Sequence, residues 1–102
     1  MRIFLISDNA DTLTGLRLAG IDGVIAHEED ELRQALEQAL AEADIGIVLI
    51  MERAARLIPE MIRDIRLNRT LPLLVEIPDR HGMGRPADFV SSYIREAIGI
   101  KL

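Results

Sequence analysis

The sequence predicts an α/β domain with a four-stranded parallel sheet flanked by helices. Short apolar runs alternate with helical patterns, and the third and fourth runs are continuously apolar, as in strands buried on both faces. Nearly half of the 102 residues are hydrophobic, 49%, but only 3% are aromatic, so the core must be aliphatic. Because crossovers between parallel strands are right-handed, the alternation also predicts helices on both faces of the sheet.

Each predicted strand is followed by a turn or a helical pattern. The strands are residues 2–6, 21–26, 45–51 and 73–77. Polar residues 7–9 follow the first strand and are suited to cap a helix, with Asp8 as a cap or turn residue. The segment after them carries Leu13, Leu16 and Leu18 around Gly15 and Gly20, and completes the opening strand–helix–strand unit of a small Rossmann-like or receiver-like fold.

The next two helical patterns differ in regularity. Residues 28–43 have apolar side chains at i, i+3, i+4 and i+7, charged residues opposite, and an acidic start that favours the positive end of the helix dipole. The following pattern is interrupted by Pro59, which does not fit inside a helix. Either residues 52–57 form a separate first turn, or Pro59 is the first residue of the main helix.

The C-terminal quarter has a different composition. Residues 79–87 are rich in Pro and Gly and lack apolar periodicity, which predicts a hinge loop after a domain of residues 1–78. Residues 88–102 form a predicted helix and tail, in which Asp88 caps the helix. Two interpretations stay open: this helix covers the open face of the sheet, or it leaves the sheet and binds a partner. Its apolar stripe is formed by Phe89, Val90, Tyr93, Ile94 and Ile98.

Composition limits the classes of function. The length predicts one globular unit, and the net charge of −5 argues against a nucleic-acid module. The chain has no cysteine, no leader-like N-terminus and no apolar run long enough to span a membrane, so we expect a cytoplasmic protein without direct membrane insertion. Residues 28–44 hold seven acidic side chains, whereas the following helix is rich in arginine. Opposite charges on these helices either attract each other or form a docking face for a charged partner.

The loops that could hold chemistry lack the required residues. A receiver domain needs an acidic pair after the first strand, an aspartate after the third and a later lysine, but Met51 and Glu52 follow the third strand and Lys101 is the only lysine. No phosphate-binding or dinucleotide-binding glycine motif is present. The run from His27 to Glu29 is a weak metal candidate, because adjacent side chains point in different directions. We therefore expect no catalytic residue, no metal and no cofactor.

Four segments in register resemble the F subunit of the V-type and A-type rotary ATPases. They are residues 11–21, with the pattern Thr-Gly-x-Arg-Leu-Ala-Gly-Ile, and residues 44–50, 71–78 and 98–102. The resemblance implies a non-catalytic rotor component of the central stalk, on the cytoplasmic side and peripheral to the membrane. It also implies that the chain binds the coiled-coil D subunit and couples ATP hydrolysis or synthesis to ion translocation.

The resemblance also suggests where partners bind. A C-terminal helix that reaches the catalytic A/B head and regulates hydrolysis matches residues 88–98, and a membrane-ring adaptor subunit is a further possible partner. We expect a partner interface at Leu16, Arg17 and Leu18, in a loop that follows the first helix, together with the C-terminal stripe. The alternative is that both leucines belong to the core and Arg17 is solvated. A stand-alone receiver-like domain that senses a small molecule or a phosphosignal is the other functional hypothesis.

Overall fold

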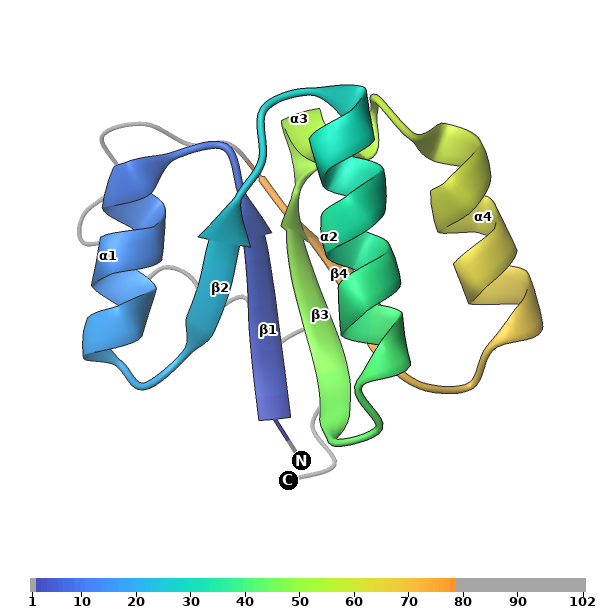
Figure 1. The fold of residues 1–102 in the computed structure, drawn as a ribbon, viewed down its shortest axis with the longest axis horizontal. Helices are drawn as coiled ribbons and strands as arrows, with labels where there is room; N and C mark the ends of the chain where they lie inside the picture. Colours follow the sequence, from blue (N-terminus) through green and yellow to red (C-terminus); the bar gives the residue numbers. More distant parts are fainter. Residues whose placement is uncertain (1, 79–102) are drawn as a thin grey trace.

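The computed structural model describes residues 2–78, which form a four-stranded sheet and four helices (Figure 1). The predictions for residues 79–102, including the hinge and the C-terminal helix, lie outside the described residues. In chain order the elements are β1 (Arg2–Ser7), α1 (Ala10–Leu18), β2 (Asp22–Ile25), α2 (Glu29–Ala41), β3 (Ile45–Met51), α3 (Glu52–Ala55), α4 (Pro59–Asn68) and β4 (Leu73–Ile77).

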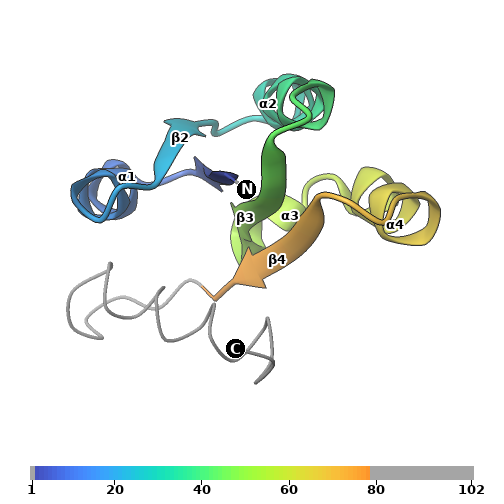
Figure 2. The same ribbon diagram turned by 90° about the horizontal axis from the view of Figure 1, so that it is seen from below.

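The sheet is entirely parallel and has the strand order β2-β1-β3-β4. Helix α1 contacts β1 and β2, whereas α2 contacts β1 and β3 and α4 contacts β4. Figure 2 shows α1 on one face of the sheet and α2 and α4 on the other. The predicted α/β class, the parallel pairing and the helices on both faces are therefore confirmed, and β1 and β3 are the two central strands.

The core is aliphatic, as the composition predicts. All seven residues of β3 are buried, and Leu5 and Ile6 of β1 are fully buried beside them. Leu32 and Leu36 of α2 are also fully buried, at positions four residues apart on one helix face. Such close-packed aliphatic layers give the domain a rigid frame.

The loop after β1 is held by its own polar side chains. Ser7 is fully buried; its Oγ donates to the carbonyl oxygen of Asn9 (3.1 Å) and accepts the Asn9 amide (2.9 Å). The α1 N-cap is Asn9, whose Oδ1 accepts the amides of Asp11 (2.8 Å) and Thr12 (3.3 Å). Asp8, which we expected to cap the helix or turn the chain, lies in the bend between β1 and the cap, and its carboxylate is 3.7 Å from Arg53 Nη1. The cap thus lies one residue later than Asp8.

The break around Pro59 combines the two alternatives that the sequence left open. A short helix, α3, occupies Glu52–Ala55, and Pro59 is the first residue of α4. Ile58 between them is fully buried, which fixes the junction against the core. Pro59 fits this position because its missing amide would have no partner in the first turn of a helix.

Across residues 2–78 the helices are short, and none combines the length and apolar character needed to cross a bilayer. Helix α2, the longest of them, has 13 residues and an exposed face rich in carboxylates. Its first turn is stabilised by Glu31, whose Oε1 accepts the amides of His27 and Glu28, both at 3.1 Å. These two donors lower the pKa of Glu31, because they stabilise the carboxylate.

Candidate protein-docking site

The carboxyl ends of the strands are the usual ligand sites of parallel sheets. Here the loop after β1 holds Asp8 beside Arg53, and β3 ends at the buried Met51, which leads directly into α3. No group of three His, Cys, Asp or Glu side chains within residues 2–78 is placed to hold a metal ion. In residues 2–78 this edge contains the hydrogen bonds that shape the loop after β1 and two ion pairs, Asp8 with Arg53 and Glu52 with Arg56.

The predicted interface at Leu16, Arg17 and Leu18 is the last turn of α1, not a loop as we expected. The helix continues to Leu18 because a paired C-cap closes it: the Ile21 amide donates to the Leu16 carbonyl (2.8 Å) and the Gly20 amide to the Arg17 carbonyl (3.0 Å). Gly20 has a φ of 87°, the left-handed conformation that this motif requires. In the sequence, this C-cap is indicated by Gly20 followed by the apolar Ile21.

The three predicted residues have different environments. Leu16 is 1% exposed and packs in the core, so it offers a partner no surface, whereas Leu18 is 86% exposed. The Arg17 Nε lies 3.4 Å from Asp22 Oδ1, and its Nη2 donates to the Gly23 carbonyl at 3.4 Å. The pKa of Asp22 is lowered, first by the Gly23 amide that its carboxylate accepts (2.8 Å) and then by Arg17.

Leu18 therefore projects from the α1 end of the domain beside a guanidinium that is held by β2. An exposed leucine next to a positioned arginine is suited to a protein contact. The other predicted interface residues, Phe89, Val90, Tyr93, Ile94 and Ile98, lie outside the described residues. The interface stays a prediction, and at α1 it rests on Arg17 and Leu18.

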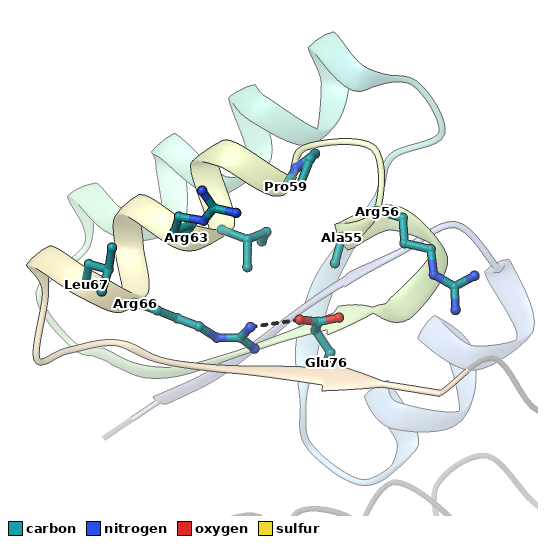
Figure 3. A pocket seen from close by; sticks show the side chains of 8 residues that line it. Ala55, Arg56, Pro59, Arg63, Arg66, Leu67 and Glu76 are labelled. Carbon is teal, nitrogen blue, oxygen red and sulfur yellow. Dashed lines mark hydrogen bonds and ion pairs between the residues drawn. The ribbon is translucent and has the colours of Figure 1, made fainter.

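A second surface feature lies at the opposite edge of the sheet, between α3, α4 and β4 (Figure 3). It is a groove of about 460 Å³ whose apolar lining is Ala55, Pro59, Ile62 and Leu67. Its charged lining consists of Arg56, Arg63, Arg66 and Glu76. We call it the arginine groove.

One side chain organises the arginine groove. The Arg66 Nη1 lies 2.9 Å from Glu76 Oε2, the pair that Figure 3 joins by a dashed line, and its Nη2 donates to the Leu74 carbonyl at 3.4 Å. Arg56 pairs with Glu52 one turn earlier in the chain. Arg63 makes no ion pair with any of residues 2–78.

The arginines of the groove are visible in the sequence, but the groove itself is not. Their spacing identified a basic helical region, and a charged docking face was one of two interpretations. The other interpretation was that the basic and acidic helices attract each other. In the described part of the chain, however, no ion pair joins α2 and α4. Glu76, which comes from β4, gave no signal in the sequence, because only the fold brings this strand beside α4.

The fold defines the class: residues 2–78 form a small, all-parallel α/β domain, whose surface carries the exposed end of α1 and the arginine groove. Comparison with known families places the chain within that class. The model of the family described as ATP synthase (F/14-kDa) subunit matches residues 3–94. The chain belongs to this family, which confirms its resemblance to the F subunit of the rotary ATPases.

Individual relatives agree along the full length. The F subunit of the A-type ATP synthase of Thermococcus kodakarensis is 33% identical over 107 aligned positions, which cover 100% of this chain and 98% of the relative. The corresponding protein of Pyrococcus furiosus is also 33% identical, over 110 positions with the same coverage. That of Methanocaldococcus jannaschii is 32% identical over 103 positions, with 100% and 99% covered.

Proposed function

We propose that this chain is the F subunit in the central stalk of an A-type ATP synthase, a rotor component without catalytic residues of its own. The observation that carries the proposal is the match to the family model over residues 3–94, together with F subunits of A-type ATP synthases that align over the whole chain. In this role the chain lies on the cytoplasmic side of the membrane, and it binds the coiled-coil D subunit and helps couple ATP synthesis or hydrolysis to ion translocation.

The physical requirements of such a role fit the domain. A stalk component must transmit torque without deforming, and a sheet whose central strands are packed on both sides resists deformation. It must also adhere to its partner through a local anchor, for which Leu18 and Arg17 at the end of α1 are the candidates. Residues 88–98 are the candidate segment for contact with the catalytic A/B head and for regulation of hydrolysis, and a membrane-ring adaptor is a further candidate partner.

The test is co-expression with the coiled-coil D subunit of the same organism, followed by size exclusion with light scattering and a titration to obtain Kd. We expect a one-to-one complex. Leu18→Asp should raise its Kd by about tenfold or more, because it places a charge in an apolar contact. Two separate peaks at micromolar concentration would contradict the stalk role.

The variant Arg17→Ala distinguishes a role of Arg17 in partner binding from a role in folding. Its pair with Asp22 is solvent-exposed, and exposed pairs of this kind contribute about 0–1 kcal/mol to stability. We expect a weaker complex but a nearly unchanged melting temperature of the isolated chain. The matched control is Arg33→Ala, which removes a comparably exposed arginine paired with Glu29 on α2. A large fall in melting temperature for Arg17→Ala alone would assign Arg17 a structural role.

The sensor hypothesis makes a different prediction. A receiver-like domain that binds a phosphosignal or a small ligand gains stability as the ligand concentration rises above its Kd. Saturable thermal stabilisation by Mg²⁺ with acetyl phosphate, or by a nucleotide, would therefore favour a sensor over a mechanical role. A flat response together with a stable stalk complex would favour the rotor role.

A further inference from the structure

We propose that the arginine groove is a second docking site, and that it receives an acidic amphipathic helix from another protein of the same assembly. The groove lies at the β4 edge of the sheet, whereas α1 packs at the β2 edge (Figure 1). A partner held at the end of α1 therefore leaves the groove open to a different contact. Only the statement that the partner is a chain of the ATP synthase rests on the proposed function.

Charge selects an acidic partner. The groove contains three arginines and one carboxylate, in a chain whose net charge is −5. Its carboxylate, Glu76, is already engaged by Arg66, and Arg56 pairs with Glu52. Arg63 has no such partner among the described residues and is free to meet a carboxylate from outside. A local excess of positive charge of this kind attracts acidic surfaces and repels basic ones.

The lining selects a partner that is also apolar. Ala55 and Ile62 are buried at the floor of the groove, and Pro59 lies at the start of α4. Leu67, near the other end of α4, is 75% exposed and is one of the most exposed apolar side chains of the described region. An occupant that satisfies both the floor and the arginines needs one apolar face with carboxylates beside it, which is the pattern of an acidic amphipathic helix.

The edge of the sheet disfavours the alternative of an added strand. β4 is an edge strand of five residues, and such edges recruit extended peptides when their main chain is free. Here Arg66 lies beside the strand, with its guanidinium bound to both Glu76 and the Leu74 carbonyl. A charged side chain that takes up a main-chain acceptor protects an edge, so the groove beside α4 is the better site and a helix the better occupant.

The experiment places a photo-crosslinking residue, p-benzoylphenylalanine, at Leu67 of the full chain, incorporated into the complete A-type ATP synthase. Because Leu67 is exposed, the replacement should leave the fold intact, which circular dichroism checks. The control carries the same residue at Gln38, on the exposed face of α2. Mass spectrometry then identifies the crosslinked segment. We expect a segment with apolar residues at i, i+3, i+4 and i+7 and a net negative charge.

Two charge reversals give the test its specificity. Arg63→Glu and Arg69→Glu change the net charge equally and both affect exposed residues of the α4 region, but only Arg63 lines the groove. We expect Arg63→Glu to reduce the Leu67 crosslink by about fivefold or more and Arg69→Glu by less than about twofold, since close charges dominate binding.

Several results would overturn the inference. They are a crosslink no stronger than at Gln38, a crosslink to an extended or basic segment, or equal sensitivity to the two reversals. If the chain enters the complex but gives one of these results, the arginine groove is not a docking site for an acidic helix, and the proposed function is unaffected. A chain that fails to enter the complex refutes the proposed function and, with it, this partner.

Discussion

Gly20 and Gly23 lie three residues apart, and each is required for a different physical reason. Gly20 needs a positive φ, but no atom lies within 4 Å of the position that a Cβ would occupy. Gly23 has no such backbone demand, but a Cβ there would lie 2.3 Å from the Leu5 carbonyl oxygen and 2.8 Å from the Leu5 Cβ. The first constraint is conformational, and the second is the close approach of β2 to β1.

We therefore expect the two alanine substitutions to differ. Gly20→Ala should lower the free energy of unfolding by about 1–2 kcal/mol through backbone strain. Gly23→Ala should lower it by about 3 kcal/mol or more, because the clash is with backbone that cannot move without disturbing the β1–β2 ladder. Urea denaturation of the full chain measures both. Gly20→Asn should recover part of the loss, since Asn tolerates the left-handed region; an equal loss for Asn and Ala would contradict this explanation.

Glu31 provides a pH-dependent contribution at the start of α2. The amides of His27 and Glu28 hold its pKa below the usual value for a glutamate. A lowered pKa in the folded state contributes stability above the unfolded pKa, and this contribution is lost as the pH falls through the folded pKa. On acidification from about pH 6 to about pH 3, the melting temperature of the wild type should therefore fall further than that of Glu31→Gln, which has no titrating side chain at position 31.

The control for this prediction is Glu37→Gln, on the same helix but beyond its first turn. The two amides of the helix start donate to Glu31 and not to Glu37, so if the cap is responsible, Glu31→Gln should change the acid dependence more than this control does. If Glu31→Gln and Glu37→Gln change the pH dependence equally, the effect belongs to the overall charge of the helix and not to the cap.

Among the secondary-structure elements, helix α1 depends for its stability on the caps at its two ends. Its N-terminal amides are satisfied by Asn9 and its C-terminal carbonyls by the amides of Gly20 and Ile21. A helix of nine residues is too short to be stable by itself in water, so these caps and the packing of Leu13 and Leu16 must hold it. The same caps fix the direction in which Leu18 projects from the last turn.

Removal of the N-cap tests this dependence. Asn9→Ala should cost about 1 kcal/mol in the free energy of unfolding, because the Asp11 and Thr12 amides lose their acceptor. Asn9→Asp should be close to neutral, since Asp offers the same acceptor and is favoured by the helix dipole. Chemical denaturation compares the two. An equal loss in both variants would show that the side-chain Nδ2 of Asn9, and not its Oδ1, is needed.

At the scale of the whole molecule, the strand order decides which parts open last. β1 and β3 are central, and β2 and β4 are edges with four and five residues. Amides in central, buried strands exchange only by large unfolding events, whereas edge strands also exchange by local opening. Hydrogen exchange followed by mass spectrometry should therefore find the slowest exchange in β3 and β1 and faster exchange in β2. Exchange in β2 as slow as in β3 would contradict this order.

The strand order also determines how the two docking surfaces are separated. The end of α1 lies at the β2 edge and the arginine groove at the β4 edge, with the two central strands between them (Figure 2). If both surfaces are occupied, the rigid sheet connects two partners and transmits force between them. This arrangement agrees with the proposed stalk function.

The local structure of this protein can be predicted from its sequence, because periodicity and capping residues act within a few positions along the chain. The sequence predicted the α/β class, the bounds of β3 and β4, the acidic start of α2 and the interruption at Pro59. The error was also local: residues 16–18 are helical because Gly20 and Ile21 close the helix later than expected. Asp8 has the second of the two roles expected for it, since it lies in the bend before the cap. Four sequence segments in register were also sufficient to indicate the family.

The residues that share a surface could not be predicted in this way, because they are brought together by the packing of helices on the sheet. The tertiary structure separated Leu16 from Leu18, because the sheet covers one side of α1 and leaves the other in solvent. It brought Glu76 of β4 to Arg66 of α4, ten residues apart, and closed the arginine groove around them. Contacts of this kind depend on how helices pack on the sheet, and neither residue spacing nor charge along the chain encodes that packing directly.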